Sequence, residues 1–241
     1  MNIHQMVTGT ALDPLPQTIK DAIKVTRRLG IRYLWIDALC IIQEGDETDK
    51  LREVGLMGQV YKNATITLAA ASARGVSEGF LHARTAPSTI PAPFYSGADK
   101  VGTVQVMRTW DASYDCMKPL NARGRTLQEA LLSRRMQIYG ERGQVWRCQT
   151  DQPKRCPGSP LACFADHATL PPEVFDPTQV FNPETATSTW NILVSSYTRR
   201  VLSFREDRLA AITGIISELK PLFDDECIFG TRRKNFVRQI A

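Results

Sequence analysis

The sequence predicts an α/β fold: a mainly parallel open sheet flanked by helices, with a β-hairpin and a C-terminal helical layer. Two short apolar runs, at residues 33–36 and 65–71, have the character of buried parallel strands. Segments with helical spacing precede and separate them, in the order helix, strand, helix, strand that a parallel sheet requires. With 241 residues, 43% of them hydrophobic, the chain can form one large domain.

The first predicted helix runs from Thr18 to Gly30. The segment from Thr18 to Asp21 has the form of a capping box, which marks a helix start. Ile19 and Ile23 recur at helical spacing, and Gly30 ends the pattern. We expect this helix to pack on the central strand that follows.

The central strand is predicted at Tyr33–Ile36, where it would bring Asp37 to the carboxyl edge of the sheet. Ligands of open α/β sheets bind just beyond such edges. Asp37, Cys40 and Gln43 are therefore candidate ligand-binding residues. Two alternatives stay open, because Asp37 could cap the next turn and Cys40 could be a small buried apolar residue. We expect the strand residues, Trp35 among them, to lie inside the sheet.

A second helix and a second strand follow. The acidic segment 44–49 suits a helix start. The apolar stripe of this helix comprises Leu51, Val54, Met57 and Tyr61. The buried strand is predicted at Thr65–Ala71, and the glycines at 75 and 79 then indicate a loop.

The next segments predict shorter elements. Residues 85–100 contain three prolines, and Val101–Met107 then alternates as an edge or antiparallel strand would. Thr126 to Glu129 fits the pattern Thr-x-x-Glu, so a short helix should begin there, with Glu129 reaching back to the helix start as a capping residue. The segment from Met136 to Cys148 is typical of a hairpin.

The chain is predicted to have three parts. Residues 1–149 would form the α/β domain, and residues 150–188, rich in proline, an irregular connection of a length that is usually functional or mobile. Residues 189–241 would form a helical extension that packs back on the domain. Its two apolar stripes are Trp190, Leu193, Val194 and Tyr197, and then Leu209, Ile212, Ile216 and Leu219.

Composition argues against several classes of protein. The net charge of +5 is scattered, which disfavours a nucleic-acid surface. No apolar run approaches the roughly 20 residues that cross a bilayer, and we expect a cytoplasmic protein without a membrane span. The cysteines form no Cys-x-x-Cys pair, so we expect thiols and no zinc, even at the set that could suggest it: Cys148, Cys156, Cys163 and His167.

Three stretches share an order and spacing with a known family. The first stretch, residues 15–43, contains the motif Tyr33–Gln43. The second, residues 57–81, contains Met57–Ala64 and Gly79–Leu81. The third, residues 123–135, begins with Arg123-Gly124-Arg125-Thr126-Leu127-Gln128-Glu129. Together they resemble the fungal heterokaryon-incompatibility (HET) domain over roughly residues 15–148, and segments at 197–199 and 207–215 look like the region that commonly follows it. Members of this family trigger a cell-death reaction when unlike strains fuse. The resemblance implies a signalling domain in self/non-self recognition, with other incompatibility proteins or copies of itself as partners.

Two departures from the family pattern stand out. No Ser-Tyr-x-Trp-Gly-like strand precedes Leu15, and Arg125 occupies a place where an aromatic residue is usual. The first implies a sheet that lacks one strand. The second implies an arginine that reaches solvent or pairs with an acid, since burying it alone is costly. Both are also compatible with an inactive, truncated remnant of a HET protein.

The resemblance also implies a possible active site. HET domains have been compared with Toll/interleukin-receptor-like domains, some of which hydrolyse NAD with a glutamate on a helix. By that similarity Glu129 would be the catalytic carboxylate, and Asp37 and Arg123 would shape the ligand site. Cys40 and Gln43 remain ligand-binding candidates from their place after the predicted strand. NAD would then be a substrate, and no cofactor or metal is implied. The sequence contains no recognisable Ser–His or Cys–His arrangement that would support any other hydrolysis. The competing interpretation is a non-catalytic signalling module that works by oligomerising or by binding another incompatibility protein.

Overall fold

A computed structural model of the protein describes most of the chain: residues 9, 11–42, 47–84, 89–107, 120–141, 143–149, 151–155, 170–176, 178, 183–201, 207–223, 227–228 and 231–232. Its helices are α2 (Gln17–Arg28), α3 (Asp37–Cys40), α4 (Glu47–Asn63), α5 (Thr126–Leu132), α6 (Pro183–Thr198) and α7 (Asp207–Phe223), with 3-10 turns η1 (Leu120–Ala122) and η2 (Pro172–Val174). Its strands are β1 (Thr67–Ala69), β2 (Thr89–Ser96), β3 (Asp99–Met107), β4 (Arg135–Tyr139), β5 (Gln144–Cys148), β6 (Asp151–Arg155), β7 (Cys227–Ile228) and β8 (Thr231–Arg232).

The α/β class is confirmed, and the central sheet has the order β1-β4-β5-β6. Only β1 and β4 are parallel, while β4–β5 and β5–β6 are antiparallel, so the described sheet is mixed rather than mainly parallel. The predicted hairpin is the β4–β5 pair. Strand β6 lies in the segment for which an irregular connection was predicted. It was not predicted because Pro153 disfavours a strand assignment from sequence.

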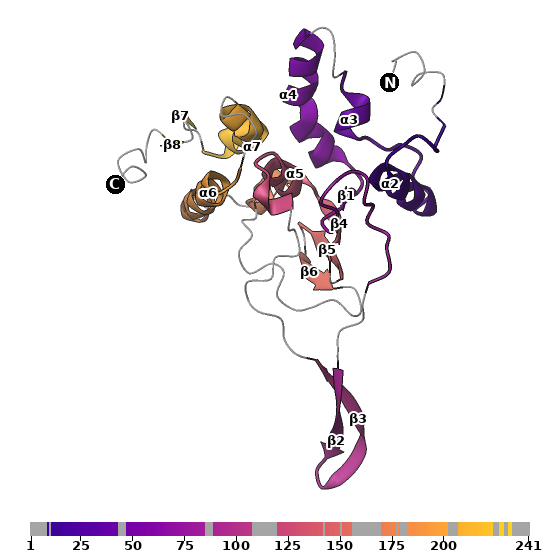
Figure 1. Ribbon diagram of the computed structural model, residues 1–241. Coiled ribbons are helices and arrows are strands. Elements are labelled where there is room, and N and C mark those ends of the chain that lie inside the picture. The colour runs from indigo at the N-terminus through magenta and orange to yellow at the C-terminus, as the bar shows by residue number, and fades with distance from the viewer. Residues whose placement is uncertain are drawn as a thin grey trace.

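Helices cover both faces of this sheet (Figure 1). On one face Val25 of α2 packs with Phe80 and Tyr139, and on the other Ala130 of α5 packs with Met136 and its neighbours. This follows from the alternation of side chains along β4, which sends Met136 and Tyr139 to opposite faces.

Helices α5, α6 and α7 share a core cluster with η2. Its buried members are Leu127, Leu131, Leu132, Leu170, Val174, Trp190, Leu193, Tyr197, Ile212, Ile215 and Leu219. The helical spacing predicted around Trp190 is thus present in α6, and that around Ile212 in α7. Helix α4 joins the layer closely, because a Cβ on Gly58 would lie 3.3 Å from the Cα of Gly214. Lys62 of α4 also forms an ion pair with Glu218 of α7.

The central strand predicted at Tyr33–Ile36 is absent, and that prediction is wrong. Residues 31–36 form no described strand, and Tyr33 is 78% exposed. Trp35 is half-buried and packs edge-to-face on Tyr61 of α4, with 5.8 Å between ring centres. Trp35 thus packs against a helix rather than inside a sheet, and Asp37 begins α3 rather than ending a strand.

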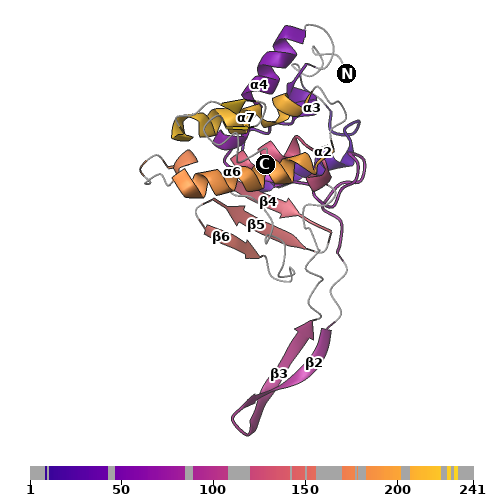
Figure 2. The ribbon, with the colours of Figure 1, turned by 90° about the vertical axis from the view of Figure 1, so that its left-hand side faces the viewer.

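Strands β2 and β3 form a hairpin that projects from the body of the protein (Figure 2). Strand β3 contains the predicted Val101–Met107 segment. Strand β2 was missed because Pro91 and Pro93 interrupt the pattern, although prolines are tolerated at a sheet edge. Both strands are largely exposed.

The residues that suggested a capping box in the first helix have another task. The cap of α2 is Pro16, without a side-chain hydrogen bond. The buried Asp21 carboxylate instead accepts hydrogen bonds from the backbone N–H groups of Phe80, at 2.8 Å, and Leu81, at 3.0 Å. Burial acts to raise the pKa of Asp21, but these bonds and one from Gln17 outweigh it and lower the pKa. The carboxylate therefore pins the 75–81 loop to α2.

Candidate functional site

Glu129 occupies the centre of the candidate site. The cap of α5 is Arg125, without a side-chain hydrogen bond, so the capping interpretation of Glu129 is wrong. The residue keeps part of its surface exposed, but its carboxyl is largely removed from water and accepts a hydrogen bond from the hydroxyl of Tyr61 on α4. The helix therefore directs this carboxyl toward α4 rather than to its own first turn.

Three charged residues act on Glu129 from different segments. Asp37 comes from the start of α3, Arg123 from the turn after η1, and Arg125 from the cap of α5. Arg125 is exposed, so the expectation that it reaches solvent is confirmed. We call Glu129, Asp37, Tyr61, Arg123 and Arg125 the Glu129 cluster.

The balance of these effects raises the pKa of Glu129 to about 7. Removal from water is the largest cause, and the negative charge of Asp37 adds to it. Arg123, the hydrogen bond from Tyr61 and Arg125 oppose the shift without cancelling it. Burial, and then the charges of Glu129 and Asp37, also raise the pKa of Tyr61. Glu129 thus changes its charge near neutral pH, which is a property of catalytic and regulatory carboxyls.

The turn that carries Arg123 is held from within its own segment. The hydroxyl of Thr126 lies 2.7 Å from the carbonyl oxygen of Leu120 and 2.8 Å from that of Arg123. Thr126 is buried, so these bonds are protected from water. The threonine that suggested a helix cap therefore shapes the turn before α5.

The segment after α6 holds the same turn from outside. Val201 forms an isolated parallel bridge with Arg123, with bonds from Gly124 N–H to Val201 oxygen at 2.9 Å and from Val201 N–H to Ala122 oxygen at 2.8 Å. The buried guanidinium of Arg200 donates to the carbonyl oxygen of Arg123, at 3.3 Å. The backbone of Arg123 is consequently clamped while its side chain stays exposed.

Of the other predicted site residues, Cys40 does not join the Glu129 cluster. Cys40 is an exposed free thiol at the end of α3, and Gln43 lies outside the described residues. Tyr61 is the residue that sequence reasoning missed, because its helical spacing assigned it to the apolar stripe of α4. Its hydroxyl was the available signal, since a buried tyrosine needs a hydrogen-bond partner.

Two further expectations concern metals and membranes. Among the described residues no group of three or more His, Cys, Asp or Glu side chains could hold a metal ion. Cys156, Cys163 and His167 lie outside the described residues. Within the described helices, none combines the length and apolar character that crossing a membrane requires.

Comparison with known families identifies the chain. The model of the family described as "Heterokaryon incompatibility protein (HET)" matches residues 2–129, which is more than half of the sequence. The chain belongs to the HET family. Its function is therefore related to heterokaryon incompatibility. The match includes all five residues of the Glu129 cluster and ends at Glu129 itself, whereas α6 and α7 lie beyond it.

Neither the curated proteins nor the solved structures include a match to this HET protein. The matched region begins at residue 2, whereas the motifs that resemble the family begin at Leu15. It contains α2, α3, α4 and most of the turn and helix that carry Arg123 and Glu129.

The raised pKa of Glu129 predicts an unusual dependence of stability on pH. A folded-state pKa above the ordinary value of 4.5 means that the folded protein binds the proton more tightly, so stability is lost as pH rises from about 4.5 to about 7. We expect Glu129→Gln to remove this loss and to raise the free energy of unfolding at pH 8 by about 1–3 kcal/mol. Urea unfolding at pH 5 and pH 8 measures it. Glu141→Gln, at an exposed site, is the control, and identical pH profiles for wild type and Glu129→Gln would contradict the prediction.

Proposed function

We propose that this HET protein is a cytoplasmic signalling domain that triggers or modulates programmed cell death in fungi, through other incompatibility proteins or through self-association. Its membership of the HET family supports a role in incompatibility. The observation that carries the proposal is the Glu129 cluster. Burial and the negative charge of Asp37 raise the pKa of Glu129, an arrangement that costs stability and is typical of functional sites.

A second candidate function is cleavage of NAD, favoured by the position of Glu129 beside Asp37 and Arg123. In this reaction the bond between ribose and nicotinamide breaks, and nicotinamide leaves with the bonding electron pair. Water then supplies a hydroxyl to the ribose carbon and releases a proton. A carboxylate at Glu129 would stabilise the positive charge that develops on the ribose, while Arg123 offers a partner for a phosphate.

One experiment tests both candidates. The chain is expressed in a fungal host beside Glu129→Gln and Asp37→Asn, with Glu141→Gln as a control for an exposed carboxylate, and viability is scored together with the NAD level. We expect the wild type and Glu141→Gln to reduce viability and the two cluster variants to lose this effect. If the protein cleaves NAD, Glu129→Gln should lower the rate about 100-fold or more.

The outcomes separate the alternatives. Loss of viability with a fall in NAD, both abolished by Glu129→Gln, favours the hydrolase. Loss of viability at a constant NAD level favours a non-catalytic signalling module. A wild-type chain that leaves viability and NAD unchanged would contradict both and favour the inactive remnant.

A further inference from the structure

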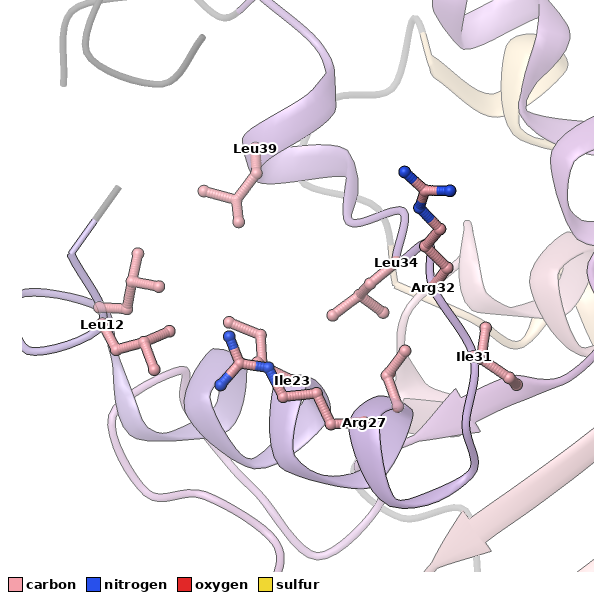
Figure 3. A pocket seen from close by; sticks show the side chains of 9 residues that line it. Leu12, Ile23, Arg27, Ile31, Arg32, Leu34 and Leu39 are labelled. Carbon is pink, nitrogen blue, oxygen red and sulfur yellow. The ribbon is translucent and has the colours of Figure 1, made fainter. Parts of the chain in front are cut away.

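A pocket separate from the Glu129 cluster lies between α2, residues 31–34 and α3 (Figure 3). Its volume is about 420 Å³. Small-molecule sites occupy about 300–1,000 Å³, so the pocket is large enough for a ligand. The aliphatic lining residues are Leu12, Leu15, Ile23, Ile31, Leu34 and Leu39.

The polar part of the lining is simple. Thr26, Arg27 and Arg32 complete the pocket. The Thr26 hydroxyl already donates to the carbonyl oxygen of Ala22, at 2.8 Å, which leaves the two guanidinium groups as the donors available to a ligand. Figure 3 shows Arg27 extended along α2 beside Ile23, and Arg32 beside Leu34 on the other side of the pocket.

The two arginines carry a positive charge that the described structure does not neutralise. Both side chains are exposed, and no carboxylate in the described part of the chain forms an ion pair with either. The guanidinium carbon of Arg32 lies 5.6 Å from the ring centre of Tyr33, a contact that supports its position without removing its charge. No acidic residue lines the pocket. An aliphatic cavity with two unneutralised cations is complementary to an anion that carries an apolar body.

We propose that this pocket binds a small organic acid, with its carboxylate beside one of the two arginines, Arg27 or Arg32, and its apolar chain against Ile23, Leu34 and Leu39. The site is independent of the proposed function, since it shares no residue with the Glu129 cluster. It does share a helix with it, because Leu39 and Asp37 both belong to α3. A ligand in the pocket would therefore contact the element that presents Asp37 to Glu129.

The test compares decanoate with decanol, which have the same apolar chain and differ in charge. Each is titrated below its aggregation concentration into the full-length chain, and the dissociation constant is measured by isothermal titration calorimetry. We expect decanoate to bind about threefold more tightly than decanol, as one partly exposed ion pair permits. Arg27→Gln combined with Arg32→Gln should abolish this preference. Arg28→Gln is the matched control, since Arg28 is the exposed neighbour of Arg27 on α2 and does not line the pocket.

Each contrary result overturns the proposal. Equal affinities for decanoate and decanol in the wild type would mean that the arginines do not recognise charge. If Arg28→Gln lost the preference for decanoate to the same extent, the preference would depend on the net charge of the protein and not on the pocket arginines. Binding to anionic phosphatidylglycerol vesicles without binding of free decanoate would assign the arginines to a membrane surface. Circular dichroism melting of each variant, all at exposed positions, verifies that the variants fold.

Discussion

Replacing Trp190 by alanine is expected to lower the free energy of unfolding by about 3–5 kcal/mol. Trp190 of α6 is 1% exposed and lies in the core cluster that joins α5, α6 and α7. Its removal leaves a cavity between these helices that the surrounding side chains fill only in part. Since typical domains are stable by about 5–15 kcal/mol, this single change takes a large fraction of the total.

Ile192→Ala is the matched control for that experiment. Ile192 lies on the same helix but is 54% exposed, so we expect its replacement to cost about 0.5 kcal/mol or less. Urea unfolding followed by circular dichroism measures both variants. Both replacements introduce alanine, which raises helix propensity in each case, so propensity does not account for a difference between them. If Trp190→Ala and Ile192→Ala cost the same, α6 does not pack on the domain as described.

Gly79→Ala is expected to destabilise the protein by about 3 kcal/mol or more. Gly79 has a φ of +75°, a conformation that costs other L-residues about 1–2 kcal/mol. A Cβ at this position would also lie 2.6 Å from a carboxylate oxygen of Asp21. That oxygen accepts the N–H groups of Phe80 and Leu81, so displacing it leaves buried donors without partners.

Gly75→Ala provides the control in the same loop. Gly75 lacks a left-handed φ, and an added Cβ would meet nothing within 4 Å. We expect its replacement to change stability by about 0.5 kcal/mol or less. Thermal unfolding of the two variants in parallel measures the difference, and equal melting temperatures would argue against the Asp21 anchor.

Elements defined by local patterns could be predicted from sequence. The β4–β5 hairpin and helix α6 are encoded by side-chain spacing within a few turns or residues of chain. The structure of Tyr33–Ile36 could not be predicted from local spacing. An apolar run indicates that a segment is buried against other elements, but it does not indicate whether those elements are strands or helices. Trp35 finds its partner in Tyr61, which is distant in sequence.

The candidate site shows the same limit. Resemblance to the HET family drew attention to Glu129, Asp37 and Arg123, and the structure places these three together. The motif around Thr126 favoured a capping role for Glu129, and this failed because Thr126 bonds backward to Leu120 instead. Whether Tyr61 belongs to a core or to a site depends on what faces its hydroxyl, which no single-sequence pattern reports.

The bridge between Arg123 and Val201 has a consequence for the exchange of HET modules between proteins. The family match stops at Glu129, yet the turn that presents Arg123 is completed by residues 200 and 201. A chimera that transplants residues 2–129 alone would contain the charged residues of the site. It would lack Arg200 and Val201, which hold the backbone of Arg123 in place. The segment that must be transferred to keep this site intact is therefore longer than the region that matches the family model, and it extends at least through Val201.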